Sequence, residues 1–485
     1  RLAAGGARGL VVAGRVLGSA ELEARGGPVE EVRCKHGGDV LARVHLARAE
    51  DIDAAMAAGA AAEGAVAALQ PGQRAEALQE LGAGLAANKA VLARTIAQEA
   101  GKPIGLAELE VDRAVGVCAD AAAVALRGLP GQEWRECGGR AGRAPLLTRR
   151  FPLGLLSFVA PFNFPLNLAV HKVAPALAAG CPFVLKPANQ TPLSALLLAE
   201  LLAGLGLPEG AFSVLPCALA DAPAFSEDAR PRMVSFTGSP AVGWALKARA
   251  GRKRVALELG GNAACIVDQG ADVGRAAARI AAGAFGYAGQ TCISVQRVLA
   301  HRSLLQPLRA ALAGHAAALN AAQGDPLDRA TLLGPLISAE AAARVQAMVR
   351  AALDTGASLV AGGASSGSFH EATVLEDVPR GAAAWCEEVF GPVVALEAFD
   401  HFDEALDAAN DSDYGLQLGV FADLRKCFRA YERSHVGGVV ANDVPSVRVD
   451  AQAYGGVKAS GLGREGALYA AEEFTELRTL LLSDL

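Results

Sequence analysis

The first third of the chain carries the apolar spacing of helices. Between residues 48 and 129, Ala, Leu, Glu and Arg dominate, and apolar positions recur every three to four residues, for example over 74–85. This period places apolar side chains on one face of an α-helix. Gly101-Lys-Pro interrupts the pattern and separates two helices. We therefore predict helices over 48–129, followed by turns or an exposed ribbon over the Gly- and Arg-rich residues 130–146.

From residue 151 the pattern changes to short apolar runs that alternate with helical segments. The run 155–159 contains one serine among four apolar residues, as is typical of strands buried on both faces. This alternation predicts a parallel sheet with right-handed crossovers. The predicted strands span 154–160, 182–186, 212–216 and 233–236, and the predicted helices span 167–180, 192–205 and 240–250. A second α/β block is predicted from about 257 to 450, and the tail 473–483 has the pattern of a strand that pairs outside its own domain.

Length and composition agree with a folded protein of several domains. A chain of 485 residues is too long for one core, so we expect two or three domains. Because 52% of the residues are hydrophobic and only 20% are charged, a disordered chain is excluded. The net charge is −6 and no basic stripe occurs, which argues against nucleic-acid binding. The longest uncharged stretch, 151–170, contains three prolines and two asparagines, so we expect no membrane-spanning helix there.

The cysteines indicate a reducing compartment. All nine are scattered, no Cys-x-x-Cys occurs, and the eight histidines do not cluster with them. This pattern predicts neither a metal site nor a disulfide framework, and it fits a cytoplasmic protein.

One cysteine and one glutamate lie in short segments that contain glycines. Cys292 lies in Gly-Tyr-Ala-Gly-Gln-Thr-Cys-Ile-Ser, and Glu258 lies 34 residues upstream in Leu-Glu-Leu-Gly-Gly. A thiol in a small-residue turn, with a carboxylate elsewhere in the chain, favours covalent catalysis: the thiolate attacks a carbonyl, and the carboxylate activates the water that releases the product. The alternative is that Cys292 is simply a small buried apolar residue.

Three strand ends carry further candidates. Phe236-Thr-Gly-Ser-Pro follows a strand and opens a helix, and Ser239 as N-cap with Pro240 after it would offer free N–H groups to a pyrophosphate. The alternative is an ordinary capped helix, since the fingerprint Gly-x-Gly-x-x-Gly is missing. Lys186 ends a strand and could bind ribose hydroxyls, or could be a solvated lysine. Asn163, in Pro-Phe-Asn-Phe-Pro, could donate to an oxyanion together with the backbone N–H of Cys292, or could form an Asx-turn. In Glu387-Glu388-Val-Phe-Gly-Pro either acid could be surface charge.

In their order and spacing these segments resemble the aldehyde dehydrogenase superfamily, from about residue 45 to the end of the chain. The resemblance implies an α/β fold with three parts: a Rossmann-like parallel-sheet cofactor domain, an α/β catalytic domain and a β-ribbon oligomerisation element. The cofactor domain would comprise 1–122 and 148–256, the catalytic domain 257–450, and the oligomerisation element 123–147 and 468–485. A homodimer or homotetramer is therefore expected.

The resemblance also implies roles for individual residues. The residues that would take part in catalysis are Cys292, Glu258, Asn163, Lys172 and Glu465. The residues that would bind the cofactor are Ala160, Pro161, Phe162, Lys186, Asn189, Gly238, Ser239, Gly243, Glu388 and Phe390. The residues that would contact the substrate are His171, at a position that often lines the substrate tunnel, and Arg113, Arg448 and Tyr454.

The implied reaction is oxidation of an aldehyde to a carboxylic acid through a cysteine thioester, with hydride transfer to NAD or NADP. Family members commonly have Glu where this chain has Asn189, and a neutral side chain there no longer repels a 2′-phosphate. We therefore expect both cofactors to be used, with NAD favoured. The stretch 215–221 also lacks the family's usual glycines, so the adenine side of the site is expected to differ.

Two alternatives and the substrate stay open at this point. A CoA-acylating dehydrogenase would release its acyl group to CoA, but such relatives commonly lack the base that Glu258 matches. A non-catalytic structural relative is disfavoured by the intact Cys, Glu, Asn and Lys set. The segments around Cys292 and Arg448 resemble a branch that acts on small polar or anionic aldehydes, such as lactaldehyde and phosphonoacetaldehyde. The alternative for Arg113 and Arg448 is that both form structural ion pairs.

Overall fold

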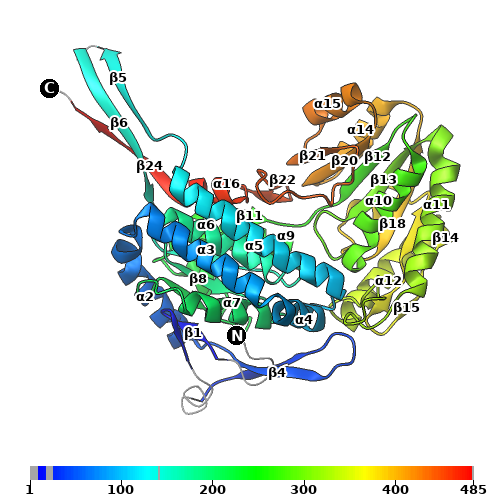
Figure 1. The fold of residues 1–485 in the computed structure, drawn as a ribbon. Coiled ribbons are helices and arrows are strands. Elements are labelled where there is room, and N and C mark those ends of the chain that lie inside the picture. Colours follow the sequence, from blue (N-terminus) through cyan, green and yellow to red (C-terminus); the bar gives the residue numbers. More distant parts are fainter. Residues whose placement is uncertain (1–8, 18–25, 140–141, 483–485) are drawn as a thin grey trace.

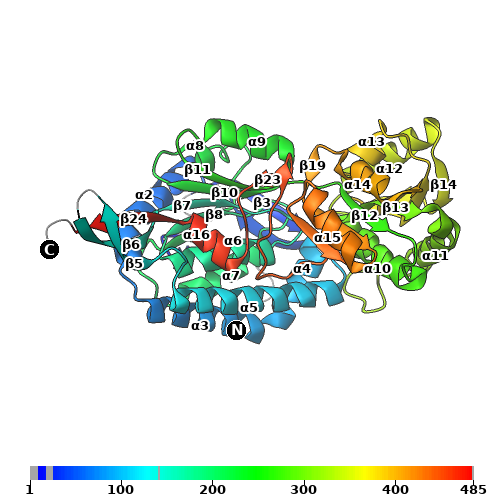
Figure 2. The same ribbon diagram turned by 90° about the horizontal axis from the view of Figure 1, so that it is seen from above.

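The computed structural model describes residues 9–17, 26–139 and 142–482, and the outermost parts of the predicted cofactor and ribbon ranges lie outside these residues. Two α/β bodies face each other, and a β-ribbon extends from the first (Figures 1 and 2). The predicted α/β class with a parallel sheet is therefore confirmed.

The first body is built on an eight-stranded sheet. Its strands run in the order β2-β1-β9-β8-β7-β10-β11-β23, and the five from β9 to β11 are parallel. The strands are β1 (Val11–Val12), β2 (Arg15–Val16), β7 (Leu156–Val159), β8 (Phe183–Lys186), β9 (Phe212–Val214), β10 (Met233–Thr237), β11 (Arg254–Glu258) and β23 (Gly461–Leu462). Each of the four strands predicted from residue 151 onwards lies within two residues of its predicted bounds, because fully apolar runs have no stable place except between two helical layers.

Helices cover both faces of this sheet (Figures 1 and 2). They are α2 (Ala49–Ala67), α3 (Pro71–Ala87), α4 (Lys89–Ala100), α5 (Ile104–Arg127), α6 (Asn167–Ala179), α7 (Leu193–Ala203), α8 (Ala224–Glu227), α9 (Pro240–Arg249) and α16 (Ala467–Glu473). The predicted break after α4 is confirmed: Gly101 ends the helix with φ +72°, a conformation that glycine adopts without strain. In this part of the chain a hairpin also forms, from β3 (Val29–Arg33) and β4 (Val40–His45).

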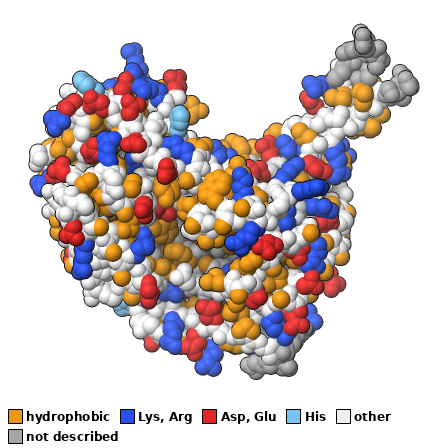
Figure 3. All heavy atoms as spheres, turned by 180° about the vertical axis from the view of Figure 1, so that it is seen from behind, with side chains coloured by type: hydrophobic (Ala, Val, Ile, Leu, Met, Phe, Trp, Pro, Cys, Tyr) orange, Lys and Arg blue, Asp and Glu red, His pale blue; other side chains and the backbone are white. Residues whose placement is uncertain are grey.

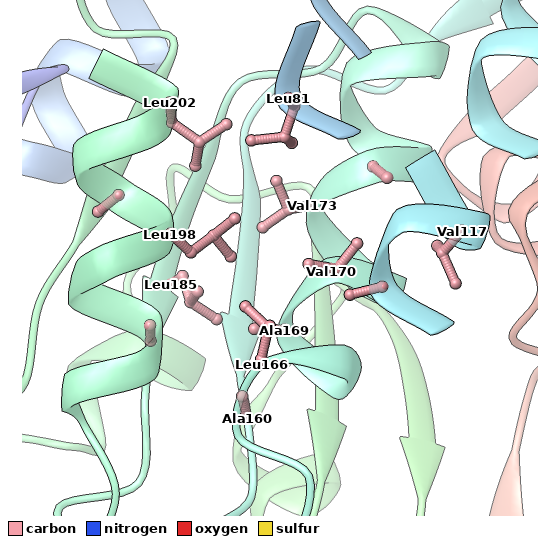
Figure 4. Close-up of a cluster of buried hydrophobic side chains, with 14 of the residues drawn as sticks. Leu81, Val117, Ala160, Leu166, Ala169, Val170, Val173, Leu185, Leu198 and Leu202 are labelled. Atoms are coloured by element: carbon pink, nitrogen blue, oxygen red, sulfur yellow. The ribbon is translucent and has the colours of Figure 1, made fainter. Parts of the chain in front are cut away.

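The core of the first body lies between β8 and the helices α3, α5, α6 and α7. Leu81, Val173 and Leu198 point toward one another there and are fully buried (Figure 4), and Val117 of α5 belongs to the same cluster. Each such side chain stabilises the fold by about 1.5–3 kcal/mol. Because α6 is buried on every side, its first residues cannot shift relative to the sheet, which fixes the side chains that α6 carries toward the site.

The second body contains a seven-stranded sheet in the order β14-β17-β18-β13-β12-β20-β21, parallel except for β14. Its strands are β12 (Ala263–Val267), β13 (Val295–His301), β14 (Ser358–Ala361), β17 (Thr373–Glu376), β18 (Val393–Phe399), β20 (Gln417–Phe421) and β21 (Gly438–Ala441). Its helices are α10 (Val273–Phe285), the 3₁₀ turn η1 (Gly286–Gly289), α11 (Arg302–Ala321), α12 (Ala339–Asp354), α13 (Ala383–Cys386), α14 (Phe402–Asn410) and α15 (Leu424–Arg433). Two short pairs complete it: β15 (Ser365–Ser366) with β16 (Phe369–His370), and β19 (Tyr414–Gly415) with β22 (Val457–Lys458).

The ribbon consists of β5 (Glu133–Gly139), β6 (Gly142–Pro152) and β24 (Thr475–Leu481). The predicted tail strand is confirmed, and it pairs with β6 from Thr475↔Pro152 to Leu481↔Leu146. The ribbon projects from the body as an arm (Figure 3). It exposes large apolar side chains: Trp134, Leu477, Leu480 and Leu481.

Within the described ranges no single helix is both long and apolar enough to cross a membrane, although α2 and α3, bent by 119°, pass together by length and composition. The same ranges hold no group of three or more His, Cys, Asp and Glu placed to bind a metal ion.

Candidate active site

The candidate residues meet where the two sheets face each other. The carboxyl ends of β7, β8, β10 and β11 share one edge, because Val159 pairs with Lys186 and with Phe236, and Thr237 pairs with Glu258. The second body contributes the segments that precede its strands β12, β13 and β18, which carry Gly261, Cys292 and Glu388. The site is therefore assembled from several loops on two rigid sheets.

Two cavities adjoin at this place, one of about 330 Å³ and one of about 420 Å³. The residues that line both are Asn163, Leu168, Thr237, Glu258 and Cys292. The predicted nucleophile, base and oxyanion donor thus stand at the junction, where each can act on molecules held in either cavity.

The backbone around Cys292 is held in an uncommon conformation. In η1, Tyr287 and Ala288 both adopt φ +51°, which is unusual for residues with a Cβ. A Cβ on Gly261 would lie 2.1 Å from the carbonyl oxygen of Cys292, so only glycine lets these two backbones approach. Such local constraint is concentrated at functional sites.

The thiol of Cys292 is close to a tyrosine. Its Sγ lies 3.1 Å from the hydroxyl of Tyr454, whose ring has the Arg448 guanidinium 3.8 Å from its centroid. Burial raises the pKa of Cys292 to about 12, the Tyr454 hydrogen bond lowers it, and the charges of Glu388 and Glu258 raise it. The tyrosine is thus one of the groups that favour the reactive thiolate.

Glu258 is buried, and one of its two carboxyl oxygens is unpaired within the described residues. Burial and the neighbouring Glu465 raise its pKa well above the usual range, whereas Arg448 and Lys172 oppose the shift. Its Oε2 has no hydrogen-bond partner within the described residues. A carboxyl with a raised pKa and a free oxygen is suited to accept a proton near neutral pH.

Asn163 is fixed by two hydrogen bonds. Its Nδ2 donates to the carbonyl of Gln290 at 3.0 Å, and its Oδ1 accepts from the backbone N–H of Phe164 at 3.1 Å. The second hydrogen of the amide remains to serve an oxyanion in the adjoining cavities. The Asx-turn expected as the alternative does not form, because the residue two positions on is Pro165, which has no N–H to donate.

A buried ionic cluster lies behind the junction. Glu465 accepts from Lys172 Nζ and from Arg448 Nη2, each at 3.2 Å. Burial alone would raise the pKa of Glu465, but the charges of Lys172 and Arg448 outweigh it and lower the pKa to about 2. Lys172 also donates to Ser235 Oγ at 2.9 Å. The cluster therefore keeps Glu465 ionised and holds Arg448 toward Tyr454.

The structure places His171 away from the lining of the 330 Å³ cavity, whereas the sequence predicted that it lines the substrate tunnel. It is fully buried and is not among the described residues that line the 330 Å³ cavity. Its Nε2 lies 2.9 Å from Asp450 Oδ1, and Asp450 also accepts from Arg113 at 2.6 Å. Burial and the charge of Arg448 lower the pKa of His171 to about 4, so the ring is neutral. His171 positions Asp450 and Arg448 and does not face the cavity.

Arg113 and Arg448 satisfy both interpretations given from the sequence. Each forms an ion pair, with Asp450 and with Glu465 respectively, and each also lines the 330 Å³ cavity. The described charged residues that line this cavity are Lys102, Arg113, Arg279 and Arg448 against Glu110, Glu258 and Glu465. Each of these cations is paired with a carboxylate, Lys102 with Glu110, Arg113 with Asp450, Arg279 with Asp443 and Arg448 with Glu465, so the lining carries no unpaired positive charge among the described residues.

The 420 Å³ cavity is lined by glycines, apolar rings, the carboxyls of Glu258 and Glu388, and Arg344. Pro161, Phe162, Gly238, Ser239, Glu388 and Phe390 all contribute to it. Ser239 is the N-cap of α9, as predicted, and its side chain forms no capping bond within the described residues. The rings of Phe162 and Phe390 meet edge to face at 5.8 Å. Glu388 accepts from the N–H of Gly261 at 2.8 Å, and burial raises its pKa to about 7, so it is not surface charge.

Two of the predicted cofactor residues serve the packing beneath this cavity. Ala160 is directed into the hydrophobic core (Figure 4) and does not line the cavity, within the described residues. Gly243 allows α9 to approach β11, because a Cβ there would lie 2.4 Å from Leu259. Ala160 directly precedes the lining residue Pro161, and Gly243 follows the lining residue Ser239 by four positions, about one helical turn.

Lys186 is 4% exposed, so it is not a solvated lysine. Its Nζ donates to Asn189 Oδ1 at 3.0 Å, and Asn189 Nδ2 donates to the carbonyl of Cys217 at 2.9 Å and to Glu30 Oε2 at 3.2 Å. Among the described residues, neither Lys186 nor Asn189 lines the 420 Å³ cavity, whereas Ala188 between them does. Glu30 was not predicted, because it belongs to the hairpin strand β3, 159 residues away in sequence.

Two further residues of the site were assigned no role from the sequence. Asn167 begins the predicted helix over 167–180 and Thr237 lies within Phe236-Thr-Gly-Ser-Pro, but neither was assigned a role, and both line the 330 Å³ cavity. Thr237 Oγ1 and both polar side-chain atoms of Asn167 lack hydrogen-bond partners within the described residues. Only the packed structure shows this, since an asparagine or threonine in sequence gives no sign of whether its bonds are satisfied.

The comparisons with known proteins point in one direction. The model of the aldehyde dehydrogenase family matches residues 23–480. A 3-sulfolactaldehyde dehydrogenase of Priestia megaterium is 38% identical over 459 residues, which are 93% of this chain and 94% of the relative. A lactaldehyde dehydrogenase of Methanocaldococcus jannaschii is 38% identical over 81% of this chain and 84% of its own. The crystal structure of aldehyde dehydrogenase 21 from Physcomitrella patens, in complex with the reaction product succinate, superimposes with a TM-score of 0.94 at 40% identity, over 100% of this chain and 99% of that one.

Proposed function

The chain belongs to the aldehyde dehydrogenase family, and we propose that it oxidises a small anionic aldehyde to the carboxylic acid, with NAD preferred over NADP. The observation that carries this proposal is the junction of the two cavities. Cys292, Glu258 and Asn163 line both, so an aldehyde in one cavity and a nicotinamide in the other would meet at the thiol.

The residues of the junction divide the chemistry between them. The Cys292 thiolate, favoured by Tyr454, forms a bond to the aldehyde carbon, and the resulting oxyanion accepts from the Asn163 amide and the Cys292 N–H. When bound, the nicotinamide accepts the hydride that this carbon loses. A thioester then remains on Cys292. Glu258 removes a proton from water, the water oxygen adds to the thioester carbon, and the carbon–sulfur bond breaks to release the acid.

The 420 Å³ cavity fits a nicotinamide dinucleotide. Gly238, Ser239 and the first turn of α9 would hold the pyrophosphate, because free N–H groups and the helix dipole attract an anion there. A Cβ on Gly238 would lie 2.5 Å from the ring of Phe236, so the turn requires glycine. Glu388 would accept from a ribose hydroxyl, and the unpartnered Thr237 Oγ1 faces both cavities.

The preference for NAD rests on Glu30. Asn189 has no charge, but it holds the Glu30 carboxylate beside Lys186, the residue expected to bind the adenosine ribose. Glu30 therefore supplies the negative charge that the family's usual Glu would supply at position 189. Its charge opposes a 2′-phosphate without excluding it, since Lys35 and Lys186 are close enough to feel the same charge.

The proposed substrate class is supported by the two arginines that line the 330 Å³ cavity and whose ion pairs fix their guanidinium groups. Arg448 and Arg113 favour a carboxylate, sulfonate or similar group at the far end of a short aldehyde. The relatives agree: one is named for a sulfonated lactaldehyde, and another was crystallised with the dicarboxylate succinate as reaction product.

The parts of the molecule have corresponding roles in this proposal. The first body is the cofactor-binding domain and the second is the catalytic domain. The ribbon is the oligomerisation element, because its exposed apolar edge is normally covered in solution. We expect light scattering at micromolar concentration to find a homodimer or homotetramer, and a monomer would contradict this. The eight cysteines whose side chains the structure describes are all free, which supports a cytoplasmic location.

The test is whether an anionic aldehyde, supplied with NAD, yields free acid without any thiol cosubstrate. We expect stoichiometric reduced cofactor and carboxylic acid from succinic semialdehyde, and no change on adding CoA. Dependence on CoA, with a CoA thioester as product, would favour the acylating alternative instead. Absence of turnover with a panel of charged and neutral aldehydes would favour the structural alternative.

A further inference from the structure

We infer that Asn167 recognises a hydroxyl group on the substrate, so that the enzyme is selective for hydroxy-aldehydes. This inference rests on the proposed function and narrows its substrate class. Asn167 is the first residue of α6, is 1% exposed, and lines the 330 Å³ cavity together with Cys292. Neither Oδ1 nor Nδ2 has a hydrogen-bond partner within the residues that the structure describes.

An unsatisfied buried amide is unusual. Leaving a buried polar group without its hydrogen bonds costs about 1–3 kcal/mol, and buried polar groups are satisfied in most proteins. Asn262 shows the ordinary situation in the same region: it is 3% exposed, its Nδ2 donates to the carbonyl of Trp385 at 2.8 Å, and its Oδ1 accepts from Ser412 Oγ at 3.3 Å. Asn262 does not line either cavity among the described residues. The unsatisfied asparagine is the one that faces the cavity.

Asn167 is not needed to cap its helix. The carboxylate of Glu110 accepts from the backbone N–H of Asn167 at 3.1 Å and from that of Leu166 at 3.0 Å. Since Glu110 already fills the capping role at the start of α6, the Asn167 amide has no local structural function there. Its polar atoms remain for a ligand.

The position of Asn167 assigns that ligand to the substrate. Asn167 lines only the 330 Å³ cavity, whereas the next residue, Leu168, lines both. The amide therefore lies on the side away from the cofactor cavity. Both polar atoms are buried from bulk solvent, so a ligand that reaches them must supply both a donated and an accepted hydrogen bond.

The chemistry of an amide selects the group. A carboxylate or sulfonate only accepts, so it would leave Oδ1 without a partner, and the arginines of the cavity are the better partners for it. An ammonium group only donates, so it would leave Nδ2 without a partner. A hydroxyl both donates and accepts, as water does, and so satisfies both atoms of Asn167.

The experiment compares two aldehydes that differ only in one hydroxyl, 2-hydroxypropanal and propanal, on the wild type and on Asn167→Leu. The wild type should prefer 2-hydroxypropanal, and the variant should lower the ratio of the two kcat/KM values about 10- to 100-fold, mainly by loss of the hydroxy substrate. The variant should also unfold at the same or a higher temperature, because an apolar side chain of similar size removes an unsatisfied polar group.

The outcomes distinguish a failure of the inference about Asn167 from a failure of the proposed function. Turnover of both aldehydes with a ratio that N167L leaves unchanged would overturn the role of Asn167 and leave the proposed function intact. A clear drop in thermal stability, with both substrates impaired equally, would show a structural role and also overturn the inference. Turnover of succinic semialdehyde but of neither 2-hydroxypropanal nor propanal by the wild type would overturn the inference alone. No turnover of any of the three aldehydes would overturn the proposed function, and the inference with it.

Discussion

The two cavities that meet at Cys292 differ in the kind of atom they present. The 420 Å³ cavity is bounded by glycines, aromatic rings and a helix start, all within a few residues of strand ends. The 330 Å³ cavity is bounded by charged side chains whose partners come from distant parts of the chain, such as Arg113 with Asp450, 337 residues apart. Recognition of a constant cofactor thus relies on backbone geometry, while recognition of the substrate relies on long-range ion pairs.

The largest expected effect concerns the junction itself. Replacing Cys292 by Ala removes the nucleophile that the chemistry on both sides requires, so we expect dehydrogenase activity to fall by at least about 10⁴-fold. Binding of NAD, followed by fluorescence titration, should be unchanged, because the 420 Å³ cavity keeps its glycines and rings. Substantial turnover in C292A would contradict the thioester mechanism.

Glu258→Gln should separate the two halves of the reaction. Acylation should still give a burst of reduced cofactor, followed by a steady-state rate lower by about 10²–10⁴-fold, because no base activates the water. Since burial and Glu465 hold the pKa of Glu258 above its usual range, the fraction of basic form grows as pH rises. The wild-type steady-state rate should therefore increase with pH on this limb, and the Gln variant should lose the limb. Loss of the burst in rapid-mixing experiments would instead indicate that Glu258 activates the thiol.

These first two predictions depend on residues that the sequence already identified, and the reason is physical. Cys292, Glu258 and Asn163 lie in short segments whose glycines and prolines dictate the backbone, so the local pattern carries the information. The four strands and the three longer helices between residues 151 and 250 were likewise predicted within about two residues, because apolar runs and helix caps are local, whereas the single-turn helix α8 was not predicted.

The residues whose surroundings differ from the prediction make contacts with parts of the chain that are distant in sequence. His171 has the helical position of a tunnel residue, but its ring pairs with Asp450, which is 279 residues away. Ala160 points into the core because β7 ends one residue before it. Asn167 and Glu30 carried no signal, since the state of a side chain's hydrogen bonds and the approach of the N-terminal hairpin arise only on packing.

Tyr454→Phe tests the substrate side at its contact with the thiol. Loss of the hydroxyl removes the hydrogen bond at 3.1 Å that favours the thiolate, so the pKa of Cys292 should rise and its alkylation by iodoacetamide should require higher pH. At a fixed pH below this pKa we expect alkylation to slow by about five- to tenfold, equivalent to a hydrogen bond of about 1 kcal/mol.

Tyr287→Phe is the matched control for this measurement. Tyr287 is as buried as Tyr454, lines the same cavity, and donates to the carbonyl of Ala100 at 3.0 Å. It should alter stability without moving the pH profile of alkylation. Equal shifts in both variants would attribute the effect to general loosening of the cavity.

The smallest effect is expected at the far end of the cofactor site, where the contrast between local and long-range recognition is least clear. Glu30 reaches Lys186 only through Asn189, so it is a long-range partner on the side otherwise formed by local motifs. Glu30→Gln should raise the affinity for NADP, measured by calorimetric titration, by about fivefold and leave that for NAD nearly unchanged. One like-charge contact at a partly exposed site is worth about 1 kcal/mol.

Glu31→Gln provides the control, because Glu31 is the neighbouring acid on the opposite face of β3 and pairs with Arg33 and Arg43. It should leave both affinities unchanged. Asn189→Glu should weaken NADP selectively, since it places a second negative charge beside Lys186. If NADP bound equally well to the wild type and to E30Q, the carboxylate would not face the 2′-position, and the preference for NAD would have to come from local backbone geometry, as on the rest of that side.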